Sequence, residues 1–317
     1  MLFSVVIPVF NSEKTVAATV DKTISFFNKN NYNFEIILIN DGSLDDSWNI
    51  LKSISEKYSN VISINLFKNV GQHFAIYEGF KFCKGDFVIT IDDDLQNDPQ
   101  ELKNLIDKSA ENYDVIFGKF KKKNHGFVRS LGSIFVNFLI NKIFLKSKKI
   151  KVSNVKLISK KVIQRIINHN PQEPYINGLV LLFSKSVANV EINHDKRKIG
   201  KSNYNFYKIK KLLFTILFNY SSYPYKLISK VGFSLSIILF FFSIHLVVGK
   251  LFNDNIIPGW TSLSVIITLL FSIVFLILIV LGEYIIRILR QLSNSQNTFI
   301  DEVIDNRKID PNEKSNF

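Results

Sequence analysis

The sequence predicts an α/β fold with a mostly parallel β-sheet, followed by helices that associate with a membrane. Apolar, β-branched runs alternate with helical patterns over about the first 200 residues, a spacing typical of a parallel sheet with helices on both faces. Two long segments late in the 317-residue chain contain no acidic or basic residue other than one histidine, and the mean hydropathy of the chain is +0.13. These two patterns predict a sheet domain and a membrane region.

Each element of the expected sheet domain follows from its own pattern. The strands are expected at residues 3–8, 34–39, 61–66, 87–91 and 115–118, with further candidates at 155–158 and 187–192. The helices are expected at about 13–27, 45–58, 71–83 and 127–144. Asn11 or Ser12 can cap the first helix, and Gly42 lies in the turn after the second strand, where a glycine can adopt a positive φ.

The fourth apolar run ends at three consecutive carboxylates, Asp92, Asp93 and Asp94. In open α/β sheets, ligands bind outside the carboxyl ends of the strands. Three adjacent acids repel one another unless a cation lies among them, and carboxylate oxygens suit Mg²⁺ or Mn²⁺, which share their remaining coordination positions with substrate phosphates. The sequence therefore predicts a divalent metal site, and a solvated acidic loop is the alternative.

Further groups with suitable chemistry follow other strands of the sheet. Asp41 ends the second strand on the same edge, and basic loops at 119–126 and 194–204 follow later strands. A carboxylate can bind a base or ribose, a metal can bridge a diphosphate, and Arg or Lys can neutralise the remaining charge. The chain has neither a Gly-x-Gly-x-x-Gly fingerprint nor a P-loop, so metal and side chains are expected to hold the diphosphate. Ordinary surface charge is the alternative for the basic loops.

The later part of the chain predicts membrane association. Apolar side chains recur at helical spacing between 209 and 220 beside lysines, which is the pattern of a basic amphipathic helix on a membrane surface. Residues 231–248 and 263–281 are each near the length of about 20 residues that crosses a bilayer, with buried core helices as the alternative. Lys and Arg crowd the outer flanks of the pair, so both termini and the sheet domain are expected on the cytoplasmic side.

These observations divide the chain. We expect the sheet domain at 1–205, juxtamembrane amphipathic helices at 206–230, two transmembrane helices at 231–290 and a loosely ordered cytoplasmic tail at 291–317. The single cysteine, Cys83, excludes an intrachain disulfide. No basic region precedes the first strand, so we expect no signal peptide and a first part that folds in the cytosol.

Four motifs, taken in order and spacing, resemble those of family 2 glycosyltransferases with a GT-A fold. They are residues 6–11, 40–47, 69–71 and 91–96. The Asp-x-Asp-Leu-Gln form, a segment with His194, Arg197 and residues 200–204, and the two C-terminal membrane helices are similar to the polyprenyl-phosphate glycosyltransferases. That group includes dolichol-phosphate mannose synthase and bacterial undecaprenyl-phosphate enzymes. The similarity extends to about Arg290.

The resemblance implies roles for individual side chains. Asp92 and Asp94, with Gln96, would form the metal and diphosphate site, and with Arg129, near the acceptor phosphate, they make up the expected catalytic set. The donor-binding residues implied are Pro8, Phe10 and Asp41 at the nucleoside, and Asp92, Asp93, Lys119, Arg197 and Lys201 at the phosphates.

The chain departs from the pattern at two places. Asn154 and Lys156 stand where close relatives often have the acid and arginine of an Asp-Phe-Arg-Leu segment. A lipid phosphate is already ionised at neutral pH, so loss of a general base there need not prevent attack. Lys119 stands at the position of a common arginine and loses bidentate geometry while it keeps the charge.

The expected function is therefore an inverting, Mg²⁺- or Mn²⁺-dependent transfer of a sugar from a nucleotide-diphosphate sugar to undecaprenyl phosphate at the cytoplasmic face of the plasma membrane, for cell-surface glycan synthesis. The expected partners are this donor, the polyprenyl-phosphate acceptor and the lipid bilayer, with possible homo-oligomers and no nucleic acid. Two alternatives stay open. One is a processive polysaccharide synthase, although neither Trp48 nor Trp260 lies in a Gln-x-x-Arg-Trp motif. The other is a catalytically inactive membrane scaffold that binds a nucleotide sugar or a partner subunit.

Overall fold

The computed structural model describes residues 1–94, 99–120, 150–171, 173–192 and 299–307, together with single positions between 230 and 288. Two compact units make up the chain. The first, Met1–Leu213 with Asn297–Phe317, contains the β-sheet and is called the sheet unit. The second, Phe214–Gln296, is called the inserted unit because the sheet unit precedes and follows it in sequence.

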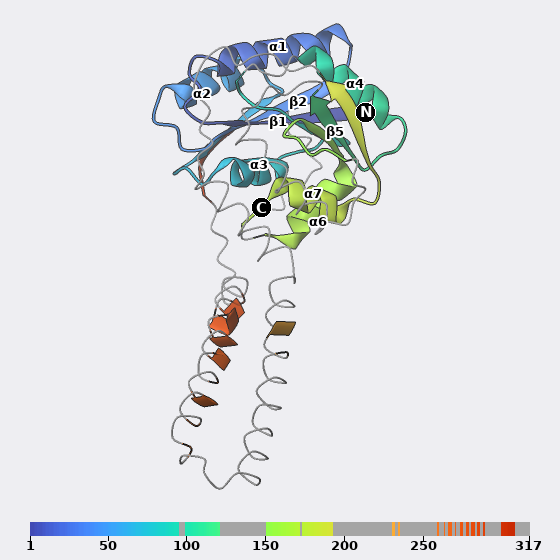
Figure 1. The fold of residues 1–317 in the computed structure, drawn as a ribbon. Coiled ribbons are helices and arrows are strands. Elements are labelled where there is room, and N and C mark those ends of the chain that lie inside the picture. The colour runs from blue at the N-terminus through green and yellow to red at the C-terminus, as the bar shows by residue number, and fades with distance from the viewer. Residues whose placement is uncertain are drawn as a thin grey trace. The chain divides into compact units, whose positions relative to one another are not determined.

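The described strands form one sheet in the order β7-β5-β6-β4-β1-β2-β3-β8 (Figure 1). The strands are β1 (Leu2–Val9), β2 (Asn33–Asn40), β3 (Val61–Leu66), β4 (Phe87–Thr90), β5 (Val115–Phe120), β6 (Lys156–Ser159), β7 (Val187–Ile192) and β8 (Ile300–Asp305). β6 is antiparallel to β4 and β5, and β8 is antiparallel to β3. The other pairs are parallel, which confirms the predicted α/β class with a mostly parallel sheet.

Helices cover both faces of this sheet, as buried parallel strands require. The helices are α1 (Val16–Lys29), α2 (Ser47–Lys57), α3 (Gln72–Phe80), the 3₁₀ turn η1 (Pro99–Glu101), α4 (Leu102–Ser109), α6 (Lys160–His169) and α7 (Ile176–Phe183). Figure 1 shows α1, α2 and α4 on one face and α3, α6 and α7 on the other. The sequence pattern did not predict α6 and α7. The apolar run of α7 has little helical periodicity because the structure buries most of its residues.

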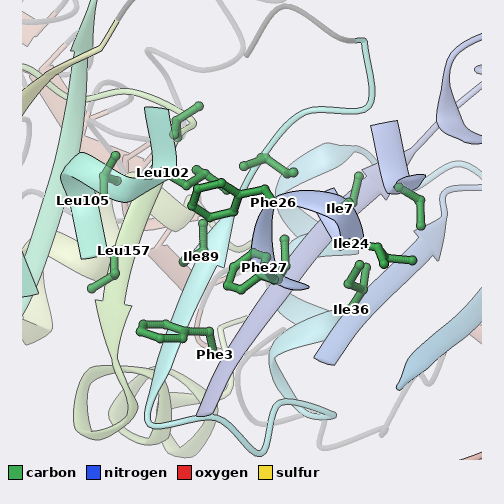
Figure 2. Close-up of a cluster of buried hydrophobic side chains, with 14 of the residues drawn as sticks. Phe3, Ile7, Ile24, Phe26, Phe27, Ile36, Ile89, Leu102, Leu105 and Leu157 are labelled. Atoms are coloured by element: carbon green, nitrogen blue, oxygen red, sulfur yellow. The ribbon is translucent and has the colours of Figure 1, made fainter. Parts of the chain in front are cut away.

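The apolar core between α1, α4 and the sheet fixes the position of β4 (Figure 2). Phe27 of α1 packs on Phe3 of β1, with ring centroids 6.1 Å apart, and stacks on Phe34 at 4.9 Å. Ile89 of β4 and Leu102 of α4 belong to the same buried cluster. Close packing of this kind leaves little freedom to the strand, so the residues that follow it start from a fixed point.

The strand order reverses between β1 and β4. From β1 the chain proceeds outward through β2 to β3, and then returns to place β4 on the other side of β1. The backbone N–H of Ile91 continues this pairing and donates to the carbonyl of Val6 at 3.2 Å. A reversal of this kind opens a crevice outside the carboxyl ends of the two strands, where ligands of open α/β sheets bind.

Gly42 adopts the positive φ predicted for it, +62°. A Cβ at this position would lie 2.5 Å from the backbone nitrogen of Asn69, in the loop after β3. Gly42→Ala therefore combines left-handed strain with a clash against backbone, and we expect it to lower the free energy of unfolding by at least about 2 kcal/mol. Urea denaturation of the detergent-solubilised chain would measure this. A loss below about 0.5 kcal/mol, the range of ordinary surface substitutions, would contradict the assignment.

The prediction that residues after Gln291 are loosely ordered was wrong for Ile300–Asp305. These residues form β8, where Val303 stands opposite Ile64 and Asp305 opposite Ile62 of β3. β3 would otherwise present an unpaired edge, and the polar strand β8 covers it. The local sequence is rich in acids, so the tertiary pairing rather than intrinsic strand propensity decides this element.

The predicted membrane segments fall largely outside the described residues. These are the amphipathic helices at 206–230 and most of the spans within 231–290. In the part of the chain that is described, no helix has the length and apolar character needed to cross a bilayer. The described positions from 263 to 288 are helical, and their exposed large apolar side chains are 41% to 60% accessible. These side chains are Leu263, Ile267, Leu270, Val274, Ile277, Leu278, Leu281, Ile285 and Ile288.

Candidate active site

Asp92 and Asp93, two of the three carboxylates after β4, lie on opposite faces of the sheet. Ile89 and Ile91 belong to the core on the α1 side, so the alternation of an extended chain directs Asp92 to the opposite face, toward α3. Asp93 returns to the α1 side. The acidic run therefore supplies groups to both faces of the sheet at the carboxyl edge, where β1 and β4 are neighbours.

Asp92 is held by two amide side chains. The Nε2 of Gln72, the first residue of α3, donates to Oδ1 of Asp92 at 2.7 Å. The Nδ2 of Asn154 lies 3.3 Å from Oδ1 and 3.4 Å from Oδ2. Burial raises the pKa of Asp92, and the charge of Asp94 raises it further, whereas Asn154, Lys156 and Gln72 act in the opposite direction. The carboxylate of Asp92, which is partly buried, thus lies close to a like charge.

Asp93 joins β4 to the loop after β1. Its Oδ2 accepts from Oγ of Ser12 at 2.5 Å and from the backbone N–H of Phe10 at 3.2 Å. Its backbone carbonyl accepts from Oγ1 of Thr19 in α1 at 3.2 Å. Burial raises the pKa of Asp93 to about 6, and the two donors limit the rise. These contacts tie Asp93 to the loop after β1 and to α1, in addition to the donor-binding role predicted for it.

Asp41 fixes the loop that leads into α3. Its Oδ1 accepts from the backbone N–H of Val70 at 2.8 Å, and its Oδ2 accepts from the N–H of Gly71 at 3.0 Å. Burial raises the pKa of Asp41 to about 6. The side chain was predicted to line the nucleoside pocket. The structure gives its carboxylate backbone partners at the carboxyl edge of β2, which the sequence did not indicate.

Lys156 is buried in β6 beside the acidic run. Only 1% of it is exposed, and its Nζ donates to the carbonyls of Asn154 at 3.0 Å and Ser153 at 3.3 Å. Burial lowers the pKa of Lys156 to about 7, although Asp92 opposes the shift. Burial also lowers the pKa of His73 to about 4, and Lys156 adds to this, so the imidazole is neutral at pH 7.

The other predicted site residues that the structure describes lie along the same edge of the sheet. Pro8 is buried within β1. Phe10, the residue that follows this strand, is 40% exposed. Lys119 near the end of β5 forms an ion pair with Glu191 of β7, with Nζ and Oε1 3.0 Å apart. Lys119 therefore has a protein partner as well as its predicted phosphate role. The predicted residues Gln96, Arg129, Arg197 and Lys201 lie outside the described residues.

The residues at this edge fit a divalent cation. Among the described residues, no group of three or more His, Cys, Asp or Glu side chains is arranged to hold a metal. Mg²⁺ and Mn²⁺ sites need fewer, because one or two carboxylates suffice where substrate phosphates supply the remaining oxygens. Burial is the main cause of the raised pKa of Asp92, and repulsion from the charge of Asp94 adds to it. A cation between the two carboxylates would relieve this repulsion. Asp92 and Asp94 would hold such an ion.

Comparison with known families agrees with this geometry. Residues 4–167, about half of the chain, match the family described as Glycosyl transferase family 2. The chain belongs to glycosyl transferase family 2. The matched segment contains most of β1, all of β2 to β4, the acidic run and Asn154 of this family 2 enzyme. The resemblance drawn from the four motifs is therefore confirmed, and the protein is a glycosyltransferase.

Relatives of this family 2 glycosyltransferase match it over nearly its whole length. An undecaprenyl-phosphate 4-deoxy-4-formamido-L-arabinose transferase from Proteus mirabilis (strain HI4320) is 30% identical over 98% of this chain and 96% of the relative. A protein of the same name from Photorhabdus laumondii subsp. laumondii is 28% identical over 98% and 97% of the two chains. Among solved structures, a glucosyl-3-phosphoglycerate synthase from Mycobacterium tuberculosis with Mn²⁺, UDP and phosphoglyceric acid has a TM-score of 0.47. It is 17% identical and covers 68% of this chain and 77% of that chain.

Sequence reasoning missed the partners of the acids in this glycosyltransferase. Gln72 follows directly after the motif at 69–71, but nothing in its local pattern indicates that it contacts Asp92. Asn154 was recognised as a departure from an acid, not as a donor to Asp92. Ser12 was expected as a helix cap and instead donates to Asp93. A pattern that is local in sequence carries no signal for contacts between residues 62 or 81 positions apart.

Proposed function

We propose that this glycosyltransferase moves a sugar from a nucleotide-diphosphate sugar to undecaprenyl phosphate, with inversion at the anomeric carbon and with Mg²⁺ or Mn²⁺ as cofactor. The observation that carries the proposal is Asp92. Its carboxylate lies near the charge of Asp94 at the carboxyl edge of the sheet, where β1 and β4 are neighbours, and amide donors from Gln72 and Asn154 hold it. That is the arrangement a metal-bound diphosphate needs.

The chemistry assigned to the chain's own residues is mainly orientation and charge. When bound, the divalent cation would neutralise charge on the departing diphosphate. Asp92 and Asp94 would hold the cation, and Asp93 keeps the loop after β1 in place through Ser12 and Phe10. The acceptor phosphate is ionised at neutral pH, so it attacks without losing a proton. An amide at Asn154 is compatible with such a reaction, because no general base is needed there.

The acceptor class comes from the relatives. Proteins named undecaprenyl-phosphate 4-deoxy-4-formamido-L-arabinose transferase match nearly the whole chain at 28% to 30% identity. We assign undecaprenyl phosphate as the acceptor on this basis and on the predicted membrane helices. At this level of identity we leave the sugar open, because a few pocket contacts decide it.

The path of the chain supports the proposed membrane topology. The sheet unit includes both Met1–Leu213 and Asn297–Phe317, and β8 pairs with β3. Because the segments before and after the inserted unit belong to one sheet unit, a chain inserted in a bilayer would cross it an even number of times. Two spans within 231–290 satisfy this condition, and the exposed apolar side chains between Leu263 and Ile288 suit lipid contact. We place the sheet unit and both termini on the cytoplasmic side.

A panel of labelled nucleotide sugars tests the proposal. The purified full chain is incubated in detergent with each donor, undecaprenyl phosphate, and Mg²⁺ or Mn²⁺. One donor is expected to give a labelled glycolipid, and EDTA is expected to abolish its formation. If no donor in a full panel gives a glycolipid, the acceptor assignment is wrong. Donor binding in calorimetry without transfer would favour an inactive scaffold, and long products on a gel would favour a processive synthase.

A further inference from the structure

Two amide side chains from separate elements converge on one carboxylate. Gln72 donates to Oδ1 of Asp92 from the first turn of α3, and Asn154 donates to both oxygens from the segment before β6. The two donors are 82 residues apart in sequence and approach Asp92 from α3 and from β6. A carboxylate with amide donors on it has a restricted rotamer, and its charged form is stabilised.

Asn154 is itself fixed on the sheet. Its backbone carbonyl accepts from Oγ1 of Thr90, the last residue of β4, at 2.5 Å and from Nζ of buried Lys156 at 3.0 Å. Thr90 is two residues before Asp92 in the sequence. The end of β4 therefore positions both Asn154, through its contact with Thr90, and Asp92, which accepts the hydrogen bonds from Asn154. Lys156 also donates to the carbonyl of Ser153, which fixes the turn before β6.

The backbone next to Gln72 is held by Asp41, which follows β2. Gln72 follows Gly71, whose backbone N–H donates to both carboxylate oxygens of Asp41, at 3.3 Å and 3.0 Å. Gly71 has φ of +98°, a conformation that a side chain would strain, so the start of α3 depends on this residue. The contacts run continuously from Asp41 at the end of β2, through the start of α3, to Asp92 at the end of β4.

An amide can donate a hydrogen bond but cannot act as a general base. The structure therefore gives Asn154 a role of its own, the donation of hydrogen bonds to Asp92. This role does not depend on the acid that close relatives often have at this position. We propose that Gln72 and Asn154 are positioning residues that hold Asp92 in the orientation that binds the divalent cation. The inference rests on the proposed function, because it assumes the metal site at Asp92 and Asp94. Outer partners of metal ligands commonly have large effects on metal affinity.

Direct Mn²⁺ binding tests this role without reliance on turnover. Free Mn²⁺ is measured by electron paramagnetic resonance in titrations of the full chain in detergent, with the metal alone and with the nucleoside diphosphate of the active donor. Gln72→Met and Asn154→Leu remove the donors and keep similar volume. Each is expected to weaken Mn²⁺ binding by about tenfold or more. The Mn²⁺ concentration for half-maximal activity should rise in parallel, with the KM for the lipid acceptor unchanged.

Asn49→Leu is the matched control. Its Nδ2 donates to Oδ1 of Asp46 at 2.7 Å on the surface of α2, so the variant removes the same kind of bond outside the site. It should bind Mn²⁺ as the wild type does. Gln72 is exposed, so its variant is expected to fold and tests the role even where Asn154→Leu does not fold. Thermal unfolding without metal identifies a folding defect.

The outcomes separate this inference from the function on which it rests. Weaker Mn²⁺ binding in Gln72→Met, with wild-type thermal unfolding, supports the positioning role. Wild-type Mn²⁺ binding that both variants retain overturns that role and leaves the proposed function in place. No Mn²⁺ binding by the wild type in either condition overturns the metal site, and this inference with it.

Discussion

Asp92→Asn is expected to lower the rate of sugar transfer by at least about a thousandfold. The substitution keeps the shape of the side chain and removes the charge that faces Asp94 and the expected cation. Metal stabilisation of a departing group contributes several kcal/mol, and about 4 kcal/mol corresponds to a factor of a thousand. Asp94→Ala should have a similar effect. The measurement is the initial rate of glycolipid formation with the active donor.

Asp107→Asn is the control for this experiment. Asp107 is an exposed aspartate on α4, so its loss removes one negative charge without touching the crevice. It should retain the wild-type rate. All variants should still fractionate with membranes, because none alters the segments expected to insert. A rate within tenfold of wild type in Asp92→Asn would remove this carboxylate from the metal site.

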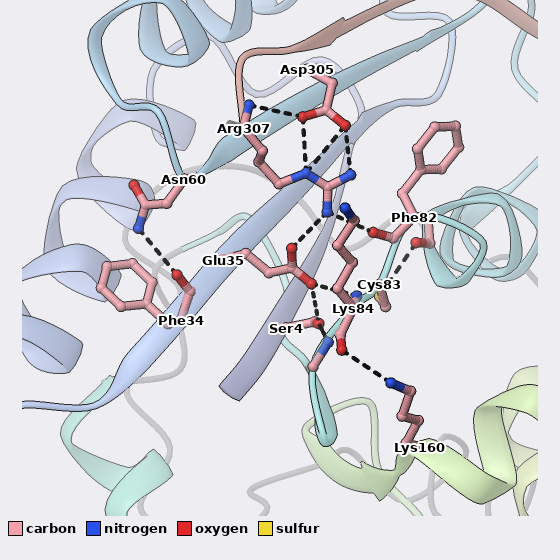
Figure 3. A network of polar contacts seen from close by, with 12 residues as sticks. Ser4, Phe34, Glu35, Asn60, Phe82, Cys83, Lys84, Lys160, Asp305 and Arg307 are labelled. Atoms are coloured by element: carbon pink, nitrogen blue, oxygen red, sulfur yellow. Dashed lines mark hydrogen bonds and ion pairs between the residues drawn. The ribbon is translucent and has the colours of Figure 1, made fainter. Parts of the chain in front are cut away.

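Arg307→Met is expected to lower the free energy of unfolding by about 3 to 5 kcal/mol. Arg307 follows β8, and its guanidinium enters a network of buried groups near the amino ends of β1 and β2 (Figure 3). Its NH1 lies 2.6 Å from Oε2 of Glu35, which is 4% exposed. Glu35 also accepts from Ser4 at 2.5 Å and from the backbone N–H of Lys84 at 2.6 Å. Without Arg307, the buried carboxylate of Glu35 loses this ion pair.

An exposed ion pair in the same C-terminal segment provides the comparison. Lys52 and Glu302 of β8 are 2.9 Å apart, with side chains 34% and 44% exposed. Lys52→Met should cost no more than about 1 kcal/mol, because solvent screens such a pair. Denaturation of the solubilised full chain measures both variants. Equal, small losses would show that Arg307 does not stabilise the sheet unit. In a double-mutant cycle, Glu35→Gln should reduce the effect of Arg307→Met.

Much of the sheet unit could be predicted from local pattern. Val61–Leu66 and Val187–Ile192 were predicted with the bounds observed, and β1 and β2 to within a residue at each end. Buried parallel strands are continuous apolar runs, so the burial of a strand on both faces can be recognised from its local composition. The turn at Gly42 was also predictable, because its positive φ favours glycine.

The sequence by itself determined the alternation of strands and helices, the three carboxylates that end β4, and membership in the glycosyltransferase family. Only the tertiary structure decided that β6 and β8 run antiparallel, and that Gln72 and Asn154 donate to Asp92. It also decided that Arg307 pairs with Glu35, 272 residues away. The physical reason is the distance along the sequence over which each kind of signal extends. Periodicity and composition reflect the environment along one segment, whereas pairing between distant segments depends on how all of them pack together.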